Sequence, residues 1–138
     1  MTKRIVLISC VSKKLPYRAK AKDLYISTLF RLSLKYANSL KPDYIYILSA
    51  KYGLLSMDQE VDTYEQTLNN MHASEIKVWA NEVIEKIGKV ASLDDDEFIF
   101  LAGEKYRKYL IPHIRNSSFP LEGLPIGKQL RYLKELTI

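Results

Sequence analysis

Three short segments of the sequence combine small residues with lysine, arginine and tyrosine, and these side chains suit the binding of a nucleotide. The segments are 9–25, 49–55 and 102–107. Small residues let the backbone approach a ligand closely, and free N–H groups before a helix can bind a phosphate or a carboxylate. Lysine adds positive charge, while tyrosine supplies a flat ring and a hydroxyl. The three segments together predict a site for a nucleotide, free or within a nucleic acid.

The expected binding roles follow from side-chain chemistry. We expect Lys13, Lys14 and Lys51 to hold phosphate, and Tyr17, Tyr52 and Tyr106 to contact a base. The remaining expected substrate-binding residues offer a hydroxyl or a close approach of the backbone, and they are Ser9, Ser27, Ser49, Gly53, Tyr64 and Gly103. Ser27 and Ser49 have an alternative role as capping or packing residues, and Gly103 as a turn residue.

Three residues are candidates for catalysis. The carboxylate of Glu65 would stabilise the oxocarbenium-like state of an N-glycosidic reaction, or it pairs with a cation in an acidic stretch. Lys51 would act as an amine base or nucleophile if burial lowered its pKa. Cys10 would be a nucleophile if Lys13 and a helix N-terminus lowered its pKa, or it is a small buried residue.

Several common kinds of site are not indicated. Neither a Walker P-loop nor a G-x-G-x-x-G sequence is present, so ATP or NAD binding in those modes is not expected. One cysteine and two histidines are too few for a structural zinc cluster, and no Ser-His-Asp triad is recognisable. We therefore expect no metal and no cofactor.

The elements that must position these residues alternate between strand and helix. Apolar, β-rich runs predict strands over 4–9, 43–49 and 97–102, with a further short strand near 118–121. This order predicts a three-layer α/β fold in which a mainly parallel sheet of about four strands carries helices on both faces. The length of 138 residues predicts a single domain over 1–138.

The expected helices have recognisable ends. Apolar spacing from Leu24 to Tyr36 predicts a helix with Asp23 as its N-cap, and the spacing from Ile76 to Ile87 predicts one that stops at Gly88. Two further helices are expected over 104–110, ended by Pro112, and over 126–136. Parallel strands all end at one edge of a sheet. We therefore expect the segments 9–25, 49–55 and 102–107 to converge there in one basic, tyrosine-lined pocket.

Charge is distributed unevenly along the chain. The net charge is +9 over residues 1–53, −9 over 54–104 and +5 over 105–138, for a total of +5. This pattern predicts a basic surface shared by the two ends, which would attract phosphate, or an ordinary surface with ion pairs between the segments. The apolar run after Arg4 is too short for a signal or membrane segment, so we expect a cytoplasmic protein without a membrane partner.

Several sequence segments resemble an uncharacterised bacterial and phage domain family that is distantly similar to the peroxide-stress protein YaaA. The resemblance rests on Ser9-Cys10, Lys14-Leu15, the stretches 23–30, 48–55, 64–68 and 101–107, and residues 120–127. The run from Cys10 to Tyr17 is also similar to a signature of the archaeosine synthase core domain, which acts on a modified tRNA base. These resemblances imply that the protein handles nucleobases or nucleic acid.

The expected function is therefore the processing of a nucleotide or nucleobase, as an N-glycosidase or a base transferase acting on nucleic acid or a nucleotide. One alternative is a nucleic-acid-binding protein of stress or defence that catalyses no reaction. Another is a sensor of a small metabolite or a module that binds a protein. The sequence leaves the oligomeric state open.

Overall fold

The centre of the protein is a five-stranded sheet. The computed structural model describes residues 2–9 and 13–136, with the exception of the side chain of Ile126. The sheet has the strand order β4-β3-β1-β6-β7 and is parallel except for β4. Its strands are β1 (Arg4–Ser9), β3 (Tyr44–Ser49), β4 (Gly53–Ser56), β6 (Glu97–Leu101) and β7 (Asn116–Ser118).

The central strand β1 is covered on both faces, as its apolar sequence predicts. Val6 and Ile8 are fully buried in the core on one face of the sheet. Ile5 and Leu7 alternate with them and lie in the core on the other face. A strand whose successive side chains enter two cores has to be apolar throughout, and this explains the unbroken run in the sequence.

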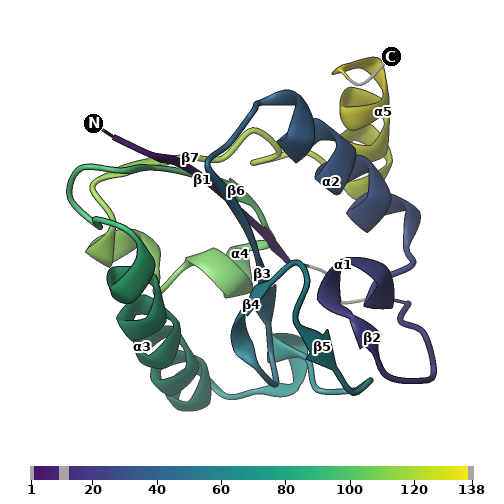
Figure 1. Cartoon of the computed structure of the whole chain (residues 1–138), viewed down its shortest axis with the longest axis horizontal. Helices are drawn as coiled ribbons and strands as arrows, with labels where there is room; N and C mark the ends of the chain where they lie inside the picture. Colours follow the sequence, from purple (N-terminus) through teal and green to yellow (C-terminus); the bar gives the residue numbers. More distant parts are fainter. Residues whose placement is uncertain (1, 10–12, 137–138) are drawn as a thin grey trace.

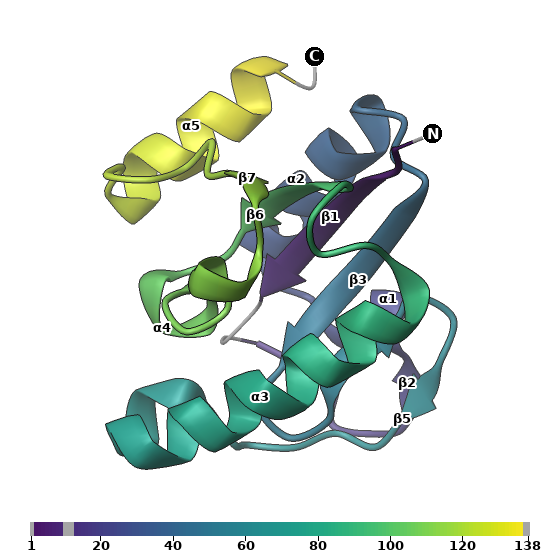
Figure 2. The same cartoon turned by 90° about the vertical axis from the view of Figure 1, so that its left-hand side faces the viewer.

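Helices cover both faces of the sheet, so the predicted three-layer α/β fold is confirmed (Figure 1). One face carries α2 (Thr28–Ser39) and α5 (Ile126–Leu136), and the other carries α3 (Ala73–Val90) and α4 (Glu104–Arg107). Figure 2 shows α3 crossing one face of the sheet and α4 near the end of β1. Short helical turns connect these elements: α1 (Ala21–Leu24), η1 (Leu68–Asn70) and η2 (Ile111–His113).

Several element boundaries differ from the prediction. The helix expected from Leu24 is interrupted, and α2 begins after Ser27, whose hydroxyl accepts a hydrogen bond from the Phe30 amide at 3.2 Å; Asp23 is therefore not the N-cap. Gly88 does not stop α3, which continues to Val90. The helix expected over 104–110 ends at Arg107, and Pro112 lies within η2.

Three strands are additional to the four that the sequence predicts. The strand expected near 118–121 is β7, slightly earlier in the chain, whereas β4 was missed because it forms a tight antiparallel hairpin with β3. Gly53 begins β4 with a φ of +74°, a conformation that glycine adopts readily. A separate two-stranded ribbon pairs β2 (Ala19–Lys20) with β5 (Glu60–Val61).

The strand order creates a switch point beside β1. The chain leaves β1 through α2 and enters β3 on one side, then passes through α3 and enters β6 on the other side. The two connecting helices lie on opposite faces of the sheet. In open α/β sheets, a ligand binds at the carboxyl ends of the strands where the order reverses, which here is the end of β1 and β6.

Within the described residues, no helix has the length and apolar character needed to cross a membrane.

Candidate functional site

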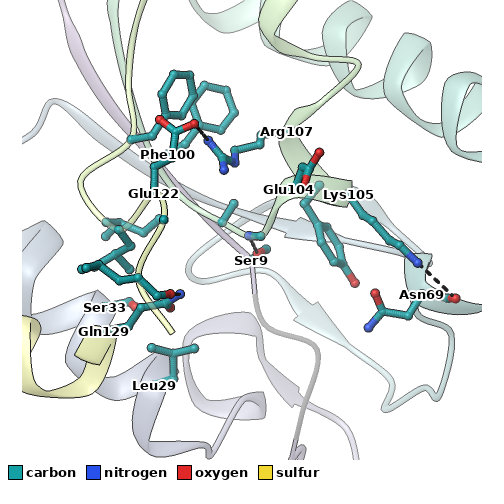
Figure 3. A pocket seen from close by; sticks show the side chains of 18 residues that line it. Ser9, Leu29, Ser33, Asn69, Phe100, Glu104, Lys105, Arg107, Glu122 and Gln129 are labelled. Atoms are coloured by element: carbon teal, nitrogen blue, oxygen red, sulfur yellow. Dashed lines mark hydrogen bonds and ion pairs between the residues drawn. The ribbon is translucent and has the colours of Figure 1, made fainter. Parts of the chain in front are cut away.

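A pocket of about 530 Å³ lies at the carboxyl ends of β1 and β6 (Figure 3). We call it the switch-point pocket. Ser9, the last residue of β1, lies in its wall, and the Ser9 hydroxyl accepts a hydrogen bond from the Gly103 amide at 3.3 Å. This bond joins the ends of the two strands between which the connections reverse. The pocket therefore occupies the place that the topology predicts for a ligand.

Besides Ser9 and Asn69, residues from α2, from the end of β6 and α4, from the turn before α5 and from α5 line this pocket. Leu29 and Ser33 come from α2, and Gln129 comes from α5. Residues 100–107 form the end of β6 and all of α4, while residues 119–124 form the turn before α5. The wall is mixed in character, because apolar side chains such as Leu29 alternate with hydroxyl, amide and charged groups.

Charged side chains of both signs reach the switch-point pocket. Nη1 of Arg107 is 3.6 Å from Oε1 of Glu122, and the guanidinium carbon is 4.9 Å from the centre of the Phe119 ring. Lys105 donates a long hydrogen bond of 3.4 Å to the Asn69 carbonyl. Glu104 also lines the pocket, and no described cation forms an ion pair with it.

A second pocket, of about 540 Å³, lies between residues 14–16 and 63–65. We call it the edge pocket. It brings together three of the predicted site residues, Lys14, Tyr64 and Glu65. Nζ of Lys14 is 4.6 Å from the centre of the Tyr64 ring, a distance suited to a cation–π contact. The exposed Glu65 adds a carboxylate at the same opening.

Buried hydroxyl groups support the end of β3, and we call this group the hydroxyl chain. The hydroxyl of Ser49 donates to the Tyr64 hydroxyl at 2.9 Å and accepts from the Tyr52 amide at 3.0 Å. The Tyr64 and Tyr25 hydroxyls are 2.5 Å apart. Nε1 of Trp79 donates to the Ser49 carbonyl at 2.8 Å. Ser49 is fully buried, so the hydroxyl chain holds the β3–β4 turn in place.

The three predicted segments do not converge in a single pocket. Ser9, Gly103 and Tyr106 line the switch-point pocket, whereas Lys14, Tyr64 and Glu65 line the edge pocket. The segment after β3 lines neither of these two pockets, because it turns back into the β3–β4 hairpin. Lys51 in that turn is exposed, and its Nζ is 5.2 Å from the centre of the Tyr52 ring. The hydroxyl of Tyr52 donates a hydrogen bond to the Asp62 carbonyl at 3.2 Å.

Of the other predicted residues, Lys13, Tyr17 and Ser27 line neither of the two pockets, and Tyr106 reaches the switch-point pocket from the core. Lys13 is exposed, and Tyr17 is 61% exposed on the loop after β1. Tyr106 is 4% exposed and packs edge-on against Trp79, with ring centres 5.7 Å apart, so its ring belongs to the core beneath α4. Ser27 caps α2. Cys10 lies outside the described residues.

Sequence reasoning assigned no role to several residues of the switch-point pocket, namely Glu104, Arg107, Glu122, Asn69 and Gln129. Two of them, Glu104 and Arg107, lie in the segment after β6 that the sequence had marked as chemically unusual. The segment after the end of β6 therefore does line the switch-point pocket, although the residues predicted from it were Gly103 and Tyr106 and not its carboxylate, Glu104. Asn69 and Gln129 had no local signal, because only the fold brings them to the pocket.

The comparison with protein families covers nearly the whole chain. A family of unknown function, DUF6884, matches residues 5–135, so the chain belongs to that family. No curated protein and no solved structure matches the chain significantly.

Proposed function

We propose that this member of the DUF6884 family processes a nucleotide or nucleobase, which binds in the switch-point pocket. The observation that carries the proposal is the position of a pocket of about 530 Å³ at the carboxyl ends of β1 and β6. Nucleotides bind at the corresponding switch point in other open α/β folds. The volume falls within the range of roughly 300–1,000 Å³ that is typical of small-molecule sites.

The lining of the switch-point pocket suits a ligand with one apolar, flat part and several polar groups. Leu29, Leu121 and Leu124 supply apolar surface on one side. The hydroxyls of Ser9 and Ser33 and the amide of Gln129 supply polar atoms around it. A few polar groups in an apolar wall fix the orientation of a ligand, and a base joined to a sugar presents this mixture.

The proposed reaction is hydrolysis or transfer at the N-glycosidic bond. A carboxylate in the pocket would stabilise the positive charge that develops on the sugar as the bond to the base breaks. In hydrolysis, a water oxygen forms the new bond to the sugar carbon and the base leaves with a proton. Glu104 is the candidate in the switch-point pocket, and Glu65 is the candidate in the edge pocket.

The resemblance to YaaA and to the archaeosine synthase core domain supports a substrate that contains a nucleobase. It rests on residues 48–55 and Tyr64 for the first and on the run from Cys10 to Tyr17 for the second. In the sequence, the first segment includes the end of β3 and the second follows the end of β1.

A second candidate function, binding of nucleic acid without a reaction, is favoured by the charge of α2 and α5. These helices lie against each other on one face of the sheet. Their exposed basic residues are Arg31, Lys35, Lys128, Arg131 and Lys134, and Glu135 is the acidic residue in their sequences. Such a cluster attracts a phosphate backbone, and each phosphate contact contributes about 0.9 to the slope of log affinity against log salt.

The experiment that separates the two candidates is a mass-spectrometric screen. The protein is incubated with nucleosides, nucleotides and short oligonucleotides, beside the variants Glu104→Gln, Glu65→Gln and Lys51→Ala. Glu82→Gln is the matched control, because Glu82 is exposed on α3 and lies in neither pocket. Release of a free base by the wild type and Glu82→Gln, and its loss in Glu104→Gln, is the expected result.

Other outcomes reject this assignment. If only Glu65→Gln loses activity, the reaction belongs to the edge pocket. If Lys51→Ala alone loses activity, the β3–β4 turn carries it. Binding of oligonucleotides with a steep salt dependence and no change of mass would establish the second candidate instead. If nothing in the panel binds or reacts, both functions are rejected and a metabolite sensor or protein-binding module is left.

A further inference from the structure

Arg107 is a largely enclosed cation at one end of the switch-point pocket. Its side chain is 13% exposed, although it pairs with the much more exposed Glu122, at 62%. α4 supplies the backbone of Arg107, and Phe119 lies against its guanidinium. In Figure 3 the Arg107 side chain reaches toward Glu122 beside Phe100. The guanidinium is therefore held in one place by the fold.

The hydrogen-bonding capacity of this guanidinium is not filled within the protein. An arginine side chain has five N–H donors. Nε of Arg107 is buried and has no hydrogen-bond acceptor among the described residues. The contact of Nη1 with Glu122, at 3.6 Å, is longer than the usual 2.7–3.2 Å of an N–H···O hydrogen bond. A buried charged donor without an acceptor is unfavourable. Because Nε itself is buried, a ligand oxygen would be bound by the terminal Nη groups, which donate no hydrogen bond of ordinary length to a described residue.

Glu122 is poorly suited to be the permanent partner of Arg107. It lies on an exposed turn next to Gly123, which has a φ of +78°. An ion pair with a carboxylate that remains mostly in water contributes little stability. The carboxylate can therefore leave when a stronger acceptor arrives. A phosphate offers several oxygens to the planar guanidinium and can bind it through two N–H groups at once.

We infer that the ligand of the switch-point pocket carries a phosphate group that replaces Glu122 on Arg107, so that the substrate class is a nucleoside monophosphate. The inference rests on the proposed function and makes it more specific. The phosphate lies at the Arg107 end of the pocket, with Lys105 as a second cation in the lining. The sugar and base extend toward Leu29 and Gln129. The phosphate of a free nucleotide and the 5′-phosphate of a nucleic-acid end share this chemistry.

The test compares pairs of ligands that differ only in the phosphate. Calorimetric titration measures the affinity of each of the four ribonucleosides and of its 5′-monophosphate for the wild type, Arg107→Gln and Arg107→Lys. We expect the wild type to bind one monophosphate at least about tenfold more tightly than its nucleoside. Arg107→Gln should bring this ratio close to one without weakening the nucleoside, and Arg107→Lys should give an intermediate ratio because it keeps the charge but loses the planar fork.

A second variant keeps the inference testable if Arg107→Gln does not fold. Glu122 is exposed, and Glu122→Gln removes the competing carboxylate, so the affinity for the monophosphate should rise while that for the nucleoside stays the same. Equal binding of nucleoside and monophosphate by the wild type, or an unchanged ratio in Arg107→Gln, overturns the inference and leaves the proposed function standing. If no compound of any pair binds and no short oligonucleotide binds either, the proposed function fails as well.

A 5′-phosphorylated dinucleotide and its unphosphorylated form distinguish the two sources of the phosphate. Tighter binding of the phosphorylated dinucleotide than of the free monophosphate assigns the site to a nucleic-acid end. The reverse order assigns it to a free nucleotide. In both cases the preference must disappear in Arg107→Gln, because a preference that persists would place the phosphate elsewhere and contradict the inference.

Discussion

At the scale of single residues, the hydroxyl of Ser49 has a clear structural role, because it bonds to Tyr64 in the lining of the edge pocket. It is fully buried, donates to Tyr64 and accepts from the Tyr52 amide. Ser49→Ala removes the acceptor of the part-buried Tyr52 amide and one of the partners of the Tyr64 hydroxyl, which keeps its contact with Tyr25. We expect the free energy of unfolding to fall by about 1–3 kcal/mol, the usual cost of a buried polar group without a partner. Urea unfolding followed by circular dichroism measures the change.

Ser56→Ala is the control for this substitution. Ser56 ends β4, is exposed, and has no hydrogen bond from its hydroxyl to a described residue. Its replacement should change the free energy of unfolding by less than about 0.5 kcal/mol. If the two variants are equally stable, the hydroxyl chain does not hold the end of β3.

The residues of the site were predictable only in part. Lys14, Tyr64 and Glu65 do lie together, because the ribbon of β2 and β5 brings residues 14–16 to 63–65. Nothing in the local sequence distinguishes Arg107 from the other cations. What distinguishes Arg107 is the enclosure of its guanidinium by Phe119, which lies twelve residues further along the chain, directly after β7. Such enclosure is a property of the tertiary structure.

At the scale of elements, two glycines give opposite predictions. Gly53 has a φ of +74° at the start of β4, where an L-residue is strained. Gly88 lies inside α3, and a Cβ there would meet nothing within 4 Å. Gly53→Ala should lower the free energy of unfolding by roughly 1–2 kcal/mol. Gly88→Ala should raise it by about 0.5–1 kcal/mol, because alanine favours a helix.

Each glycine variant serves as the control for the other, since the chemical change is the same. Thermal and urea unfolding of both variants give the signs directly. Stabilisation by Gly53→Ala would mean that the β3–β4 turn relaxes to accept a Cβ. Destabilisation by Gly88→Ala would mean that α3 ends before Val90.

Two features were not predicted from the sequence, the β3–β4 hairpin and the interruption between α1 and α2, and each depends on a single residue. The hairpin of β3 and β4 depends on Gly53, which sits in a run, Gly53-Leu54-Leu55, that reads equally well as a helix or a loop. The interruption between α1 and α2 depends on Ser27, whose hydroxyl satisfies the first turn of α2. Asp23 and Ser27 are both good capping residues, and the choice between them is made by packing of Leu24 and Tyr25 into the core.

At the scale of the whole molecule, the arrangement of the sheet follows from the sequence with few assumptions. Strands that are apolar on both faces, such as β1, must be covered by helices on both sides. Alternation of strand and helix then favours parallel pairing and places all the strand ends at one edge. The expectation of a single pocket failed because a hairpin, rather than a crossover, follows β3 and directs residues 50–52 away from β1 and β6.

The stability of the whole molecule should also depend on Asp96. This residue directly precedes β6 and so lies at the amino ends of the strands, whereas the switch-point pocket lies at their carboxyl ends. The amides of Lys3 and Ser92 each donate to its carboxylate at 2.7 Å, and these bonds lower the pKa of Asp96 below its ordinary value. A carboxyl group with a lowered pKa stabilises the folded state at pH values above its unfolded pKa of about 3.9. That contribution is lost as the pH falls through the folded pKa.

Asp96→Asn tests this prediction when the urea midpoint is measured from pH 7 to pH 2.5. The variant should unfold at lower urea than the wild type at pH 7, and the difference should shrink once the pH falls below about 4. Asp94→Asn, in the same turn, is the control. A difference that is constant over the whole range would show that the charge of Asp96 does not contribute to folding.

The assembly of the switch-point pocket from distant segments has a consequence for biosynthesis. The parallel strands β1, β3 and β6 are all complete by Leu101, whereas the wall of the pocket also needs the turn 119–124 and Gln129. A chain emerging from the ribosome can therefore pair these strands before it has a complete pocket. A ligand of that pocket would arrive too late to guide the folding of the nascent sheet, and would instead protect finished molecules from unfolding and proteolysis.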